Sequence, residues 1–197
     1  MKLVFATHNL NKFAEVQKLM PAHIALVSLT DIGCTDEIPE TGKTLEANAR
    51  IKADYVTQNF GLPCFADDTG LLVDALNGAP GVYSARYAGT QKSAAANMAK
   101  LLKALGGLTD QDDRKARFTT VIALNLDQET HIFEGIVEGE IIAERQGEGG
   151  FGYDPIFRPM GYEKTFAELP LEVKNKIGHR GKAVHKLLHF LETSTSR

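Results

Sequence analysis

The sequence predicts an α/β fold built on a mixed β-sheet with helices packed against it. At the N-terminus, short apolar segments alternate with a segment of helical periodicity, which is the pattern of a β-α-β unit. Further along, two apolar segments rich in β-branched residues follow one another across a short turn, which predicts an antiparallel hairpin. Parallel and antiparallel strands in one chain indicate a mixed sheet. The length of 197 residues suits a single domain over residues 1–197.

Residues 2–33 carry the β-α-β pattern. Residues 2–6 form an apolar run that stops at polar residues, and apolar side chains then recur at helical spacing up to Pro21. Residues 24–29 are again short and apolar, and they precede a turn at residues 31–33. We therefore expect a strand, a helix and a second strand.

The middle of the chain predicts one strand between two further helices. Residues 44–59 keep most apolar side chains near one face and predict an amphipathic helix closed by Gly61. Residues 64–66 predict a strand that ends at two aspartates. The alanine- and lysine-rich residues 93–105 predict another helix, and a loop precedes it at residues 77–81.

The last third of the chain supplies the hairpin, a loop and a helix. Residues 116–126 and 131–138 predict the two strands of the hairpin. Residues 147–155 are dense in glycine and predict a loop, and residues 170–191 predict one continuous final helix. A polar tail follows at residues 193–197.

The composition excludes several classes of function. A formal net charge of −3 with 24% charged residues offers no basic surface of the kind that nucleic acid or anionic membranes need. The two cysteines lie far apart and form neither a zinc motif nor a disulfide framework. The N-terminal apolar run is too short for a signal peptide, and no segment approaches the roughly 20 apolar residues of a membrane span. We expect a cytoplasmic protein that binds neither nucleic acid nor membranes.

Thr7, Asn9 and Lys12 lie where the first predicted strand becomes a helix. Backbone N–H groups and the helix dipole attract phosphate at such a point, and Lys12 would add a full charge. The segment lacks the glycines of common phosphate-binding loops, and the same residues would also serve as an asparagine cap beside a solvated lysine. Both interpretations remain open for this segment alone.

Asp67 and Asp68 follow the predicted strand at residues 64–66, and open α/β sheets hold ligands at the ends of strands. Adjacent carboxylates on a strand point to different sides and cannot both be buried without a cation or protons. One of them could bind Mg²⁺ and also take a proton from an attacking water, with Glu40 as a further oxygen ligand. The alternative is a turn in which an aspartate caps local backbone amides.

The glycine-rich loop carries Phe151 and Tyr153, and the segment after it carries Lys174, His179 and Arg180. Glycines let a backbone approach a flat ligand, an aromatic ring stacks on a base, and His and Arg side chains contact base edges or phosphate. The alternative is a wide turn with core aromatics and a solvated basic helix face. Taken together, the three groups of residues are the parts of a nucleotide hydrolase.

Several motifs, in this order along the chain, make the sequence similar to the inosine triphosphate pyrophosphatase family, also called the XTP/dITP diphosphatases. They are T-x-N-x-x-K, E-T-G-x-T with E-A-N-A, A-D-D-T-G-L, G-x-P-G-V-Y-S-A-R-Y, G-F-G-Y-D-P-I-F and K-x-x-I-x-H-R-G. The resemblance implies a mixed, twisted central sheet flanked by helices, two lobes with the active-site cleft between them, and a homodimer. It also implies Mg²⁺-dependent hydrolysis of ITP, dITP and XTP to the monophosphate and pyrophosphate, which clears damaged purine nucleotides from the pool.

The resemblance assigns a role to each matching residue. Asp68 is the proton acceptor and a metal ligand, and Glu40 is the second metal ligand. The implied phosphate contacts are Thr7, His8, Asn9, Leu10, Asn11 and Lys12, and Thr69 is a further substrate contact. The implied base-recognition set is Phe151, Gly152, Tyr153, Asp154, Lys174, His179 and Arg180. Two of these depart from the family pattern: Thr69 replaces a serine but keeps the hydroxyl, and His8 stands where a glycine is common.

Other functions remain open from the sequence. They are a phosphatase for another damaged nucleotide, a nucleotide sensor without turnover, and a maf-like septum-associated pyrophosphatase, against which the G-F-G-Y-D and H-R-G elements argue. For the favoured function we expect a 6-oxo purine without a 2-amino group, because the wrong base leaves polar groups of the site unpaired. The loop at residues 78–87, with Val82 and Tyr83, is expected at an interface, at a cleft rim or simply at the surface.

Overall fold

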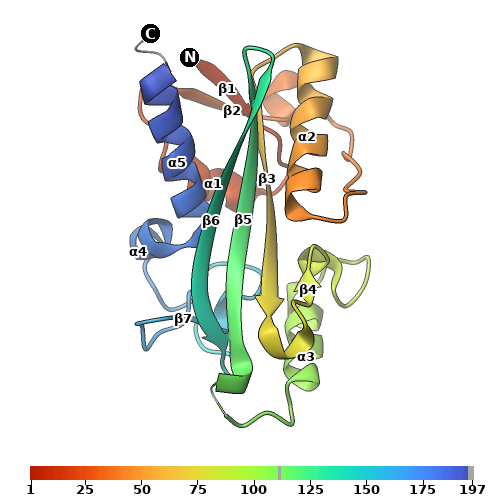
Figure 1. Ribbon diagram of the computed structural model, residues 1–197, viewed down its shortest axis with the longest axis vertical. Helices are drawn as coiled ribbons and strands as arrows, with labels where there is room; N and C mark the ends of the chain where they lie inside the picture. Colours follow the sequence, from red (N-terminus) through yellow and green to blue (C-terminus); the bar gives the residue numbers. More distant parts are fainter. Residues whose placement is uncertain (111, 195–197) are drawn as a thin grey trace. The chain divides into compact units, whose positions relative to one another are not determined.

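The protein has the predicted α/β fold, built on one mixed sheet (Figure 1). The computed structural model describes residues 1–110 and 112–194, and the end of the predicted polar tail lies outside them. Within these residues the sheet has seven strands in the order β2-β1-β3-β5-β6-β7, with β4 paired to β3. The strands are β1 Lys2–Phe5, β2 Ala25–Ser28, β3 Cys64–Val73, β4 Pro80–Gly81, β5 Lys115–Leu126, β6 Glu129–Ile141 and β7 Phe157–Pro159. The α-helices are α1 Leu10–Gln17, α2 Leu45–Phe60, α3 Ala94–Ala104, α4 Leu171–Ile177 and α5 His179–Ser194.

The pairing of the strands confirms the mixed sheet. β1 is parallel to both β2 and β3, as a β-α-β unit requires. β4 is antiparallel to β3, and β7 is antiparallel to β6. β5 and β6 are neighbours joined across Asp127 and Gln128, which both have positive φ, so the predicted hairpin is formed by a tight two-residue turn.

Residue contacts divide the chain into two compact units. The first unit comprises Met1–Asp68, Thr120–Gly135 and His179–Arg197, and the second comprises Thr69–Thr119 and Ile136–Gly178. The boundaries fall inside β3 and β5, at the end of the first half of β6, and between α4 and α5. Each unit is therefore assembled from segments that are far apart in the sequence.

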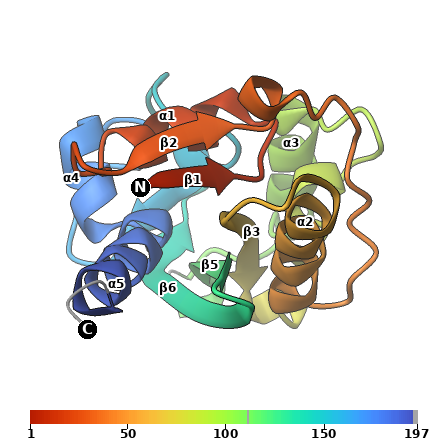
Figure 2. The same ribbon diagram turned by 90° about the horizontal axis from the view of Figure 1, so that it is seen from above.

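The core of the first unit lies on both faces of its strands. Leu3 and Phe5 of β1 pack in one apolar cluster with side chains of α1 and α5, while Val4 packs in a second cluster with α2. β3 repeats the alternation, because Phe65 belongs to the first cluster and Ala66 to the second. Figure 2 shows α5 and α2 on opposite sides of these strands. Strands buried on both faces explain the continuous apolar runs in the sequence.

The core of the second unit is rich in aromatic rings. Phe118 of β5 lies 4.7 Å from Phe157 of β7, measured between ring centroids, and Phe157 lies 5.2 Å from Phe166. Tyr153 and the apolar face of α3, including Leu101, complete this cluster. Tyr153 is therefore a core residue of this unit, as one of the two interpretations of the loop predicts.

β3 does not end at the two aspartates, contrary to the prediction. It continues for five residues beyond Asp68, to Val73. Leu71 and Val73 are fully buried in the second core, and Leu71 pairs with Gly81 of β4. Burial and strand pairing outweigh the low strand propensity of aspartate.

The predicted single helix at residues 170–191 is also wrong, because Gly178 separates α4 from α5. Gly178 has an extended backbone, with φ −73° and ψ 160°, and its amide donates to the carbonyl of Lys174. A Cβ at Gly178 would lie 2.5 Å from that carbonyl oxygen, so the close approach requires glycine. As a result, Lys174 and Arg180 belong to different helices and to different compact units.

None of the helices in the described part of the chain has both the length and the hydropathy of a membrane span.

Candidate active site

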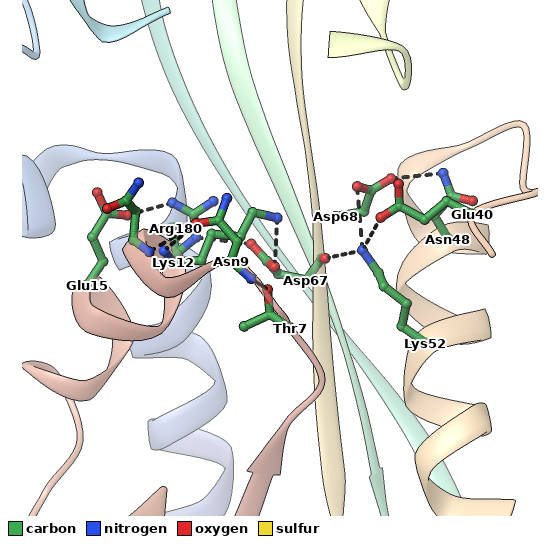
Figure 3. A network of polar contacts seen from close by, with 11 residues as sticks. Thr7, Asn9, Lys12, Glu15, Glu40, Asn48, Lys52, Asp67, Asp68 and Arg180 are labelled. Atoms are coloured by element: carbon green, nitrogen blue, oxygen red, sulfur yellow. Dashed lines mark hydrogen bonds and ion pairs between the residues drawn. The ribbon is translucent and has the colours of Figure 1, made fainter. Parts of the chain in front are cut away.

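Asp67 and Asp68 lie in the interior of β3 and point to opposite sides of it (Figure 3). Both are buried, with relative exposures of 1% and 7%. Because consecutive strand residues face opposite ways, the two carboxylates share a backbone but have different neighbours. Asp67 faces residues of α1 and α5, whereas Asp68 faces residues of α2 and the loop before it.

Asp67 accepts hydrogen bonds from two cations on two helices. Its Oδ1 lies 2.9 Å from Lys12 Nζ, and its Oδ2 lies 3.0 Å from Arg180 Nε. Arg180 Nη1 also donates to Glu15 Oε2 at 2.6 Å. These four residues, which we call the Asp67 cluster, place two carboxylates against two cations in the interior of the first unit.

Electrostatics keep Asp67 ionised. Burial by itself raises the pKa of Asp67, but Lys12 and Arg180 together with Lys52 outweigh it and hold this pKa well below its ordinary value. Burial lowers the pKa of Lys12, although Asp67 opposes this effect. Since both carboxylate oxygens of Asp67 face cations, its role in the structure is to anchor them.

Asp68 belongs to a second group, the Asp68 cluster, formed with Glu40, Asn48 and Lys52. Asn48 Nδ2 donates to Asp68 Oδ2 at 3.0 Å. Lys52 Nζ lies 3.7 Å from Asp68 Oδ1 and donates to Glu40 Oε1 at 2.7 Å. The same ammonium donates to the backbone carbonyl of Asp67 at 2.7 Å, which fixes Lys52 against β3.

The pKa of Asp68 shifts in the opposite direction to that of Asp67. Burial raises the pKa of Asp68 above its ordinary value, and the nearby cations Lys52 and Lys12 do not cancel this effect. Two neighbouring carboxylates whose environments push their pKa values apart are typical of a site that assigns them different tasks. Asp68 is the one suited to exchange a proton.

Glu40 and Asp68 fit the ligand set that Mg²⁺ prefers, which is one or two carboxylates completed by water and phosphate oxygens. The fit rests on their convergence from a loop and a strand on one cation, Lys52 Nζ. Over the described residues there is no group of three or more His, Cys, Asp or Glu side chains that could hold a metal ion by itself. A Mg²⁺ at this pair would therefore need ligands from water and from a bound anion.

The turn before α1 is held by its own side chains. Thr7 Oγ1 accepts the amide of Asn9 at 3.1 Å, and Asn9 Oδ1 accepts the amides of Asn11 and Lys12 at 3.0 and 3.1 Å. Asn9 is thus the N-cap of α1, as one interpretation of the segment predicts. The solvated lysine that accompanied this interpretation is wrong, because the Lys12 side chain is only 15% exposed and faces Asp67.

His8 and Leu10 flank this cap. His8 Nε2 lies 2.9 Å from the carbonyl oxygen of Asp36, so the His8 ring packs on a neighbouring loop. Leu10 is 81% exposed at the first position of α1. The contact of Leu10 with substrate stays a prediction.

In the second unit the glycine-rich loop is organised by Asp154. Asp154 Oδ2 accepts the amide of Phe151 at 2.8 Å and the Lys174 ammonium at 2.6 Å. The same ammonium lies 4.7 Å from the centre of the Phe151 ring. Gly150 has φ +69°, and a Cβ there would collide with the Asp154 carboxylate, so the loop closes on this aspartate only with glycine.

Lys174, His179 and Arg180 do not form a solvated helix face, so the alternative interpretation of these three residues is wrong. Their relative exposures are 5%, 4% and 4%. Lys174 pairs with Asp154 in the second unit, whereas Arg180 pairs with Asp67 in the first. Gly135 of β6 lets α5 begin close to the strand, since a Cβ there would collide with the carbonyl of His179. The cleft expected between the lobes stays a prediction.

Three residues of the site were not identified from the sequence: Glu15, Asn48 and Lys52. Asn48 and Lys52 are one helical turn apart in α2 and lie on its buried side with Ala49 and Ala53. A polar and a charged residue among the apolar positions of an amphipathic helix was the available signal, because such groups are buried only when paired. Thr69 follows Asp68 in β3 and is partly exposed.

Comparison with known proteins gives one consistent result. The sequence profile of the Ham1 family matches residues 3–190. A dITP/XTP pyrophosphatase from Flavobacterium johnsoniae is 61% identical over 97% of this chain and 98% of its own length. A dITP/XTP pyrophosphatase from Christiangramia forsetii is 59% identical over 97% of this chain and 99% of its own. The solved structure of a HAM1 protein from Coxiella burnetii is similar with a TM-score of 0.89 and 42% identity, covering 98% of this chain and 99% of that one.

Proposed function

Because the chain belongs to the Ham1 family, we propose that it hydrolyses dITP and XTP, together with ITP, to the nucleoside monophosphate and pyrophosphate with Mg²⁺ as cofactor. Its relatives are named dITP/XTP pyrophosphatases, so the chain is a nucleoside triphosphate diphosphatase. The observation that carries the proposal is the separation of Asp67, anchored between cations, from Asp68, whose pKa is raised in the other cluster. In this proposal Asp68 exchanges a proton, and Asp67 holds Lys12 and Arg180 in place.

Asp68 is the general base of the proposed reaction. It accepts a proton from the water that attacks the α-phosphorus of the substrate, and its raised pKa brings it closer to the operating pH. Asn48 Nδ2, a neutral donor, holds one of its oxygens and so orients the carboxylate without adding a charge. Glu40 and Asp68 would hold Mg²⁺, which supplies charge neutralisation of the phosphate oxygens when bound.

The cations of the first unit bind the triphosphate in this proposal. Lys12, Lys52 and Arg180 are each held by a carboxylate, which fixes the positions of their charges before substrate arrives. Preorganised cations stabilise the charge that develops on phosphate during in-line displacement. Asp67 contributes indirectly, because it keeps Lys12 and Arg180 in place.

The base is recognised by the glycine-rich loop of the second unit in this proposal. Phe151 is only partly buried and offers a ring face, and Asp154 with Lys174 offers a fixed acceptor and donor. A 6-oxo purine presents an acceptor at the position where adenine presents a donor, so ATP is disfavoured. The family resemblance also leads us to propose that the protein is cytoplasmic and forms a homodimer. Light scattering of the purified protein tests the dimer.

Product analysis tests the proposed function. The purified protein is incubated with dITP, XTP, ITP, GTP and ATP, with and without Mg²⁺, and pyrophosphate and orthophosphate are followed separately. We expect pyrophosphate from dITP, XTP and ITP only, and only with the metal. Release of orthophosphate would indicate a phosphatase, and tight binding without turnover would indicate a nucleotide sensor.

A further inference from the structure

Asn48 connects the loop of Glu40 to the carboxylate of Asp68. Its side chain is fully buried, with 0% relative exposure, in the second turn of α2. Asn48 Oδ1 accepts the amide of Gly42 at 2.8 Å, and Asn48 Nδ2 donates to Asp68 Oδ2 at 3.0 Å. One side chain amide thus joins the two segments that carry the carboxylates of the Asp68 cluster. Figure 3 shows its bond to Asp68.

The two bonds fix the orientation of the Asn48 amide. Its oxygen must face the N–H of Gly42, which only donates, and its nitrogen must face the carboxylate of Asp68, which accepts. A buried amide is costly unless it is hydrogen-bonded, so both partners are needed to keep Asn48 inside. Flipping the amide would place an oxygen against the carboxylate, and this conformation is excluded.

The loop lies tightly against the start of α2 at this point. A Cβ on Gly42 would lie 2.7 Å from Ala47 Cβ and 2.7 Å from Asn48 Oδ1. The absence of a side chain at Gly42 therefore permits its amide to reach Asn48. Two residues further back, Glu40 is held by Lys52, one turn beyond Asn48 in the same helix.

We infer that Asn48 is a positioning residue that fixes the Asp68 carboxylate and the Gly42 loop relative to each other. The inference rests on the proposed function in one respect, namely that Asp68 acts on the attacking water. Asn48 Nδ2 is a neutral donor to Asp68 Oδ2, so it orients the carboxylate without adding a charge there. Asp67 differs, because both of its oxygens face cations.

Three variants separate the two bonds of Asn48. Asn48→Leu removes both bonds, and Asn48→Asp keeps an acceptor for the Gly42 amide but loses the donor to Asp68. Asn125→Leu is the matched control, because buried Asn125 also donates to a carboxylate of the first unit, Asp54 Oδ1, at 2.8 Å. Each protein is assayed for pyrophosphate release from dITP and for hydrogen exchange of the Gly42 amide by NMR.

We expect kcat to fall by about 10²-fold in both Asn48 variants with KM within about threefold, because a small misplacement of a catalytic group costs about this much. The Gly42 amide should exchange rapidly in Asn48→Leu and stay protected in Asn48→Asp. Asn125→Leu should keep kcat within about twofold of wild type. Asn48 variants that retain the kcat of Asn125→Leu would overturn the inference.

A second readout keeps this inference separable from the proposed function. At fixed pH without metal, the carboxyl ¹³C resonance of Asp68 should shift in Asn48→Leu and remain unchanged in Asn125→Leu. If the wild-type protein releases no pyrophosphate, the proposed function fails, and this resonance alone decides the role of Asn48. An Asp68 resonance that is the same in wild type and Asn48→Leu would overturn the positioning role.

Discussion

The Asp67 cluster and the Asp68 cluster begin at consecutive residues of one strand, yet they differ in almost every physical respect. Asp67 has a cation at each oxygen, and its pKa is lowered. Asp68 has a neutral amide at one oxygen and a lysine at 3.7 Å from the other, and its pKa is raised. Burial alone therefore does not assign a role to a carboxylate; the charge and distance of its partners do.

The largest expected effect is on turnover by Asp68→Asn. Loss of the general base should lower kcat for dITP by at least about 10³-fold. Because burial raises the pKa of Asp68 in the folded state, its ionised form opposes folding at neutral pH. The metal-free variant should therefore unfold thermally at or above the wild-type temperature. Retained turnover would refute the assignment of Asp68.

Asp67→Asn should act mainly on stability. It leaves Lys12 and Arg180 buried without their shared carboxylate, and breaking a buried ion pair costs about 3–5 kcal/mol. Urea unfolding monitored by circular dichroism measures the loss. The control is Asp74→Asn, whose pair with Arg117 is exposed, and its free energy of unfolding should change by about 0.5 kcal/mol or less. Similar small losses in both variants would contradict the anchoring role of Asp67.

The stability difference between wild type and Asp67→Asn should depend on pH. The folded-state pKa of Asp67 lies below its unfolded value of about 3.9, so the ionised carboxylate stabilises the fold at pH values above the unfolded pKa. This contribution is lost as pH falls below about 4 toward the folded pKa. Urea unfolding of both proteins at pH 7, 5, 4 and 3 should show a gap that is constant down to pH 5 and then narrows. A gap that widens on acidification would contradict a folded-state pKa of Asp67 below its unfolded value.

The smallest expected effect is on substrate recognition in the second unit. Lys174→Met removes the cation beside Phe151 and leaves Asp154 without its ammonium partner. Because the lost pair is buried, Lys174→Met should also be less stable by about 3–5 kcal/mol, so kcat/KM is measured under conditions where circular dichroism shows the variant folded. There we expect kcat/KM for dITP to fall by about tenfold, the scale of a lost binding contact. Lys100→Met is the matched control, because Lys100 also lies over an aromatic ring, Tyr87, but at the surface. Equal effects of the two substitutions would remove Lys174 from base recognition.

Most of the fold could be predicted because its elements are encoded locally. Apolar runs of strand length and a helix closed by Gly61 in the left-handed conformation gave correct positions for β1, β2 and α2. The failures came where distant packing decides. β3 extends to Val73 because side chains beyond Asp68 are buried in the second core. A glycine inside a helix usually only weakens it, but the close contact of Gly178 with the carbonyl of Lys174 ends the helix there.

The site was predictable in part for the same reason. Asn9, Lys12 and Asp68 were identified because their residue types stand at a turn between elements or as an adjacent pair of carboxylates. The partners of these residues were not, since Glu15 and Arg180 are 165 positions apart, and Arg180 and Asp67 are 113 apart. Hydrophobic periodicity carries no information over such separations. A charged residue on the buried face of a helix, such as Lys52, does indicate that a buried partner exists.

The position of Arg180 has a consequence for how the chain is made. Asp67 of β3 is synthesised 113 positions before its arginine, which lies in α5. Until α5 is synthesised, the first unit lacks one of the two cations that allow this carboxylate to be buried. Chains that are released early, or that are shortened before α5, therefore retain a charge that opposes closure of the core and leaves them open to proteases. Burial of the Asp67 carboxylate thus depends on a helix that is made more than a hundred residues later.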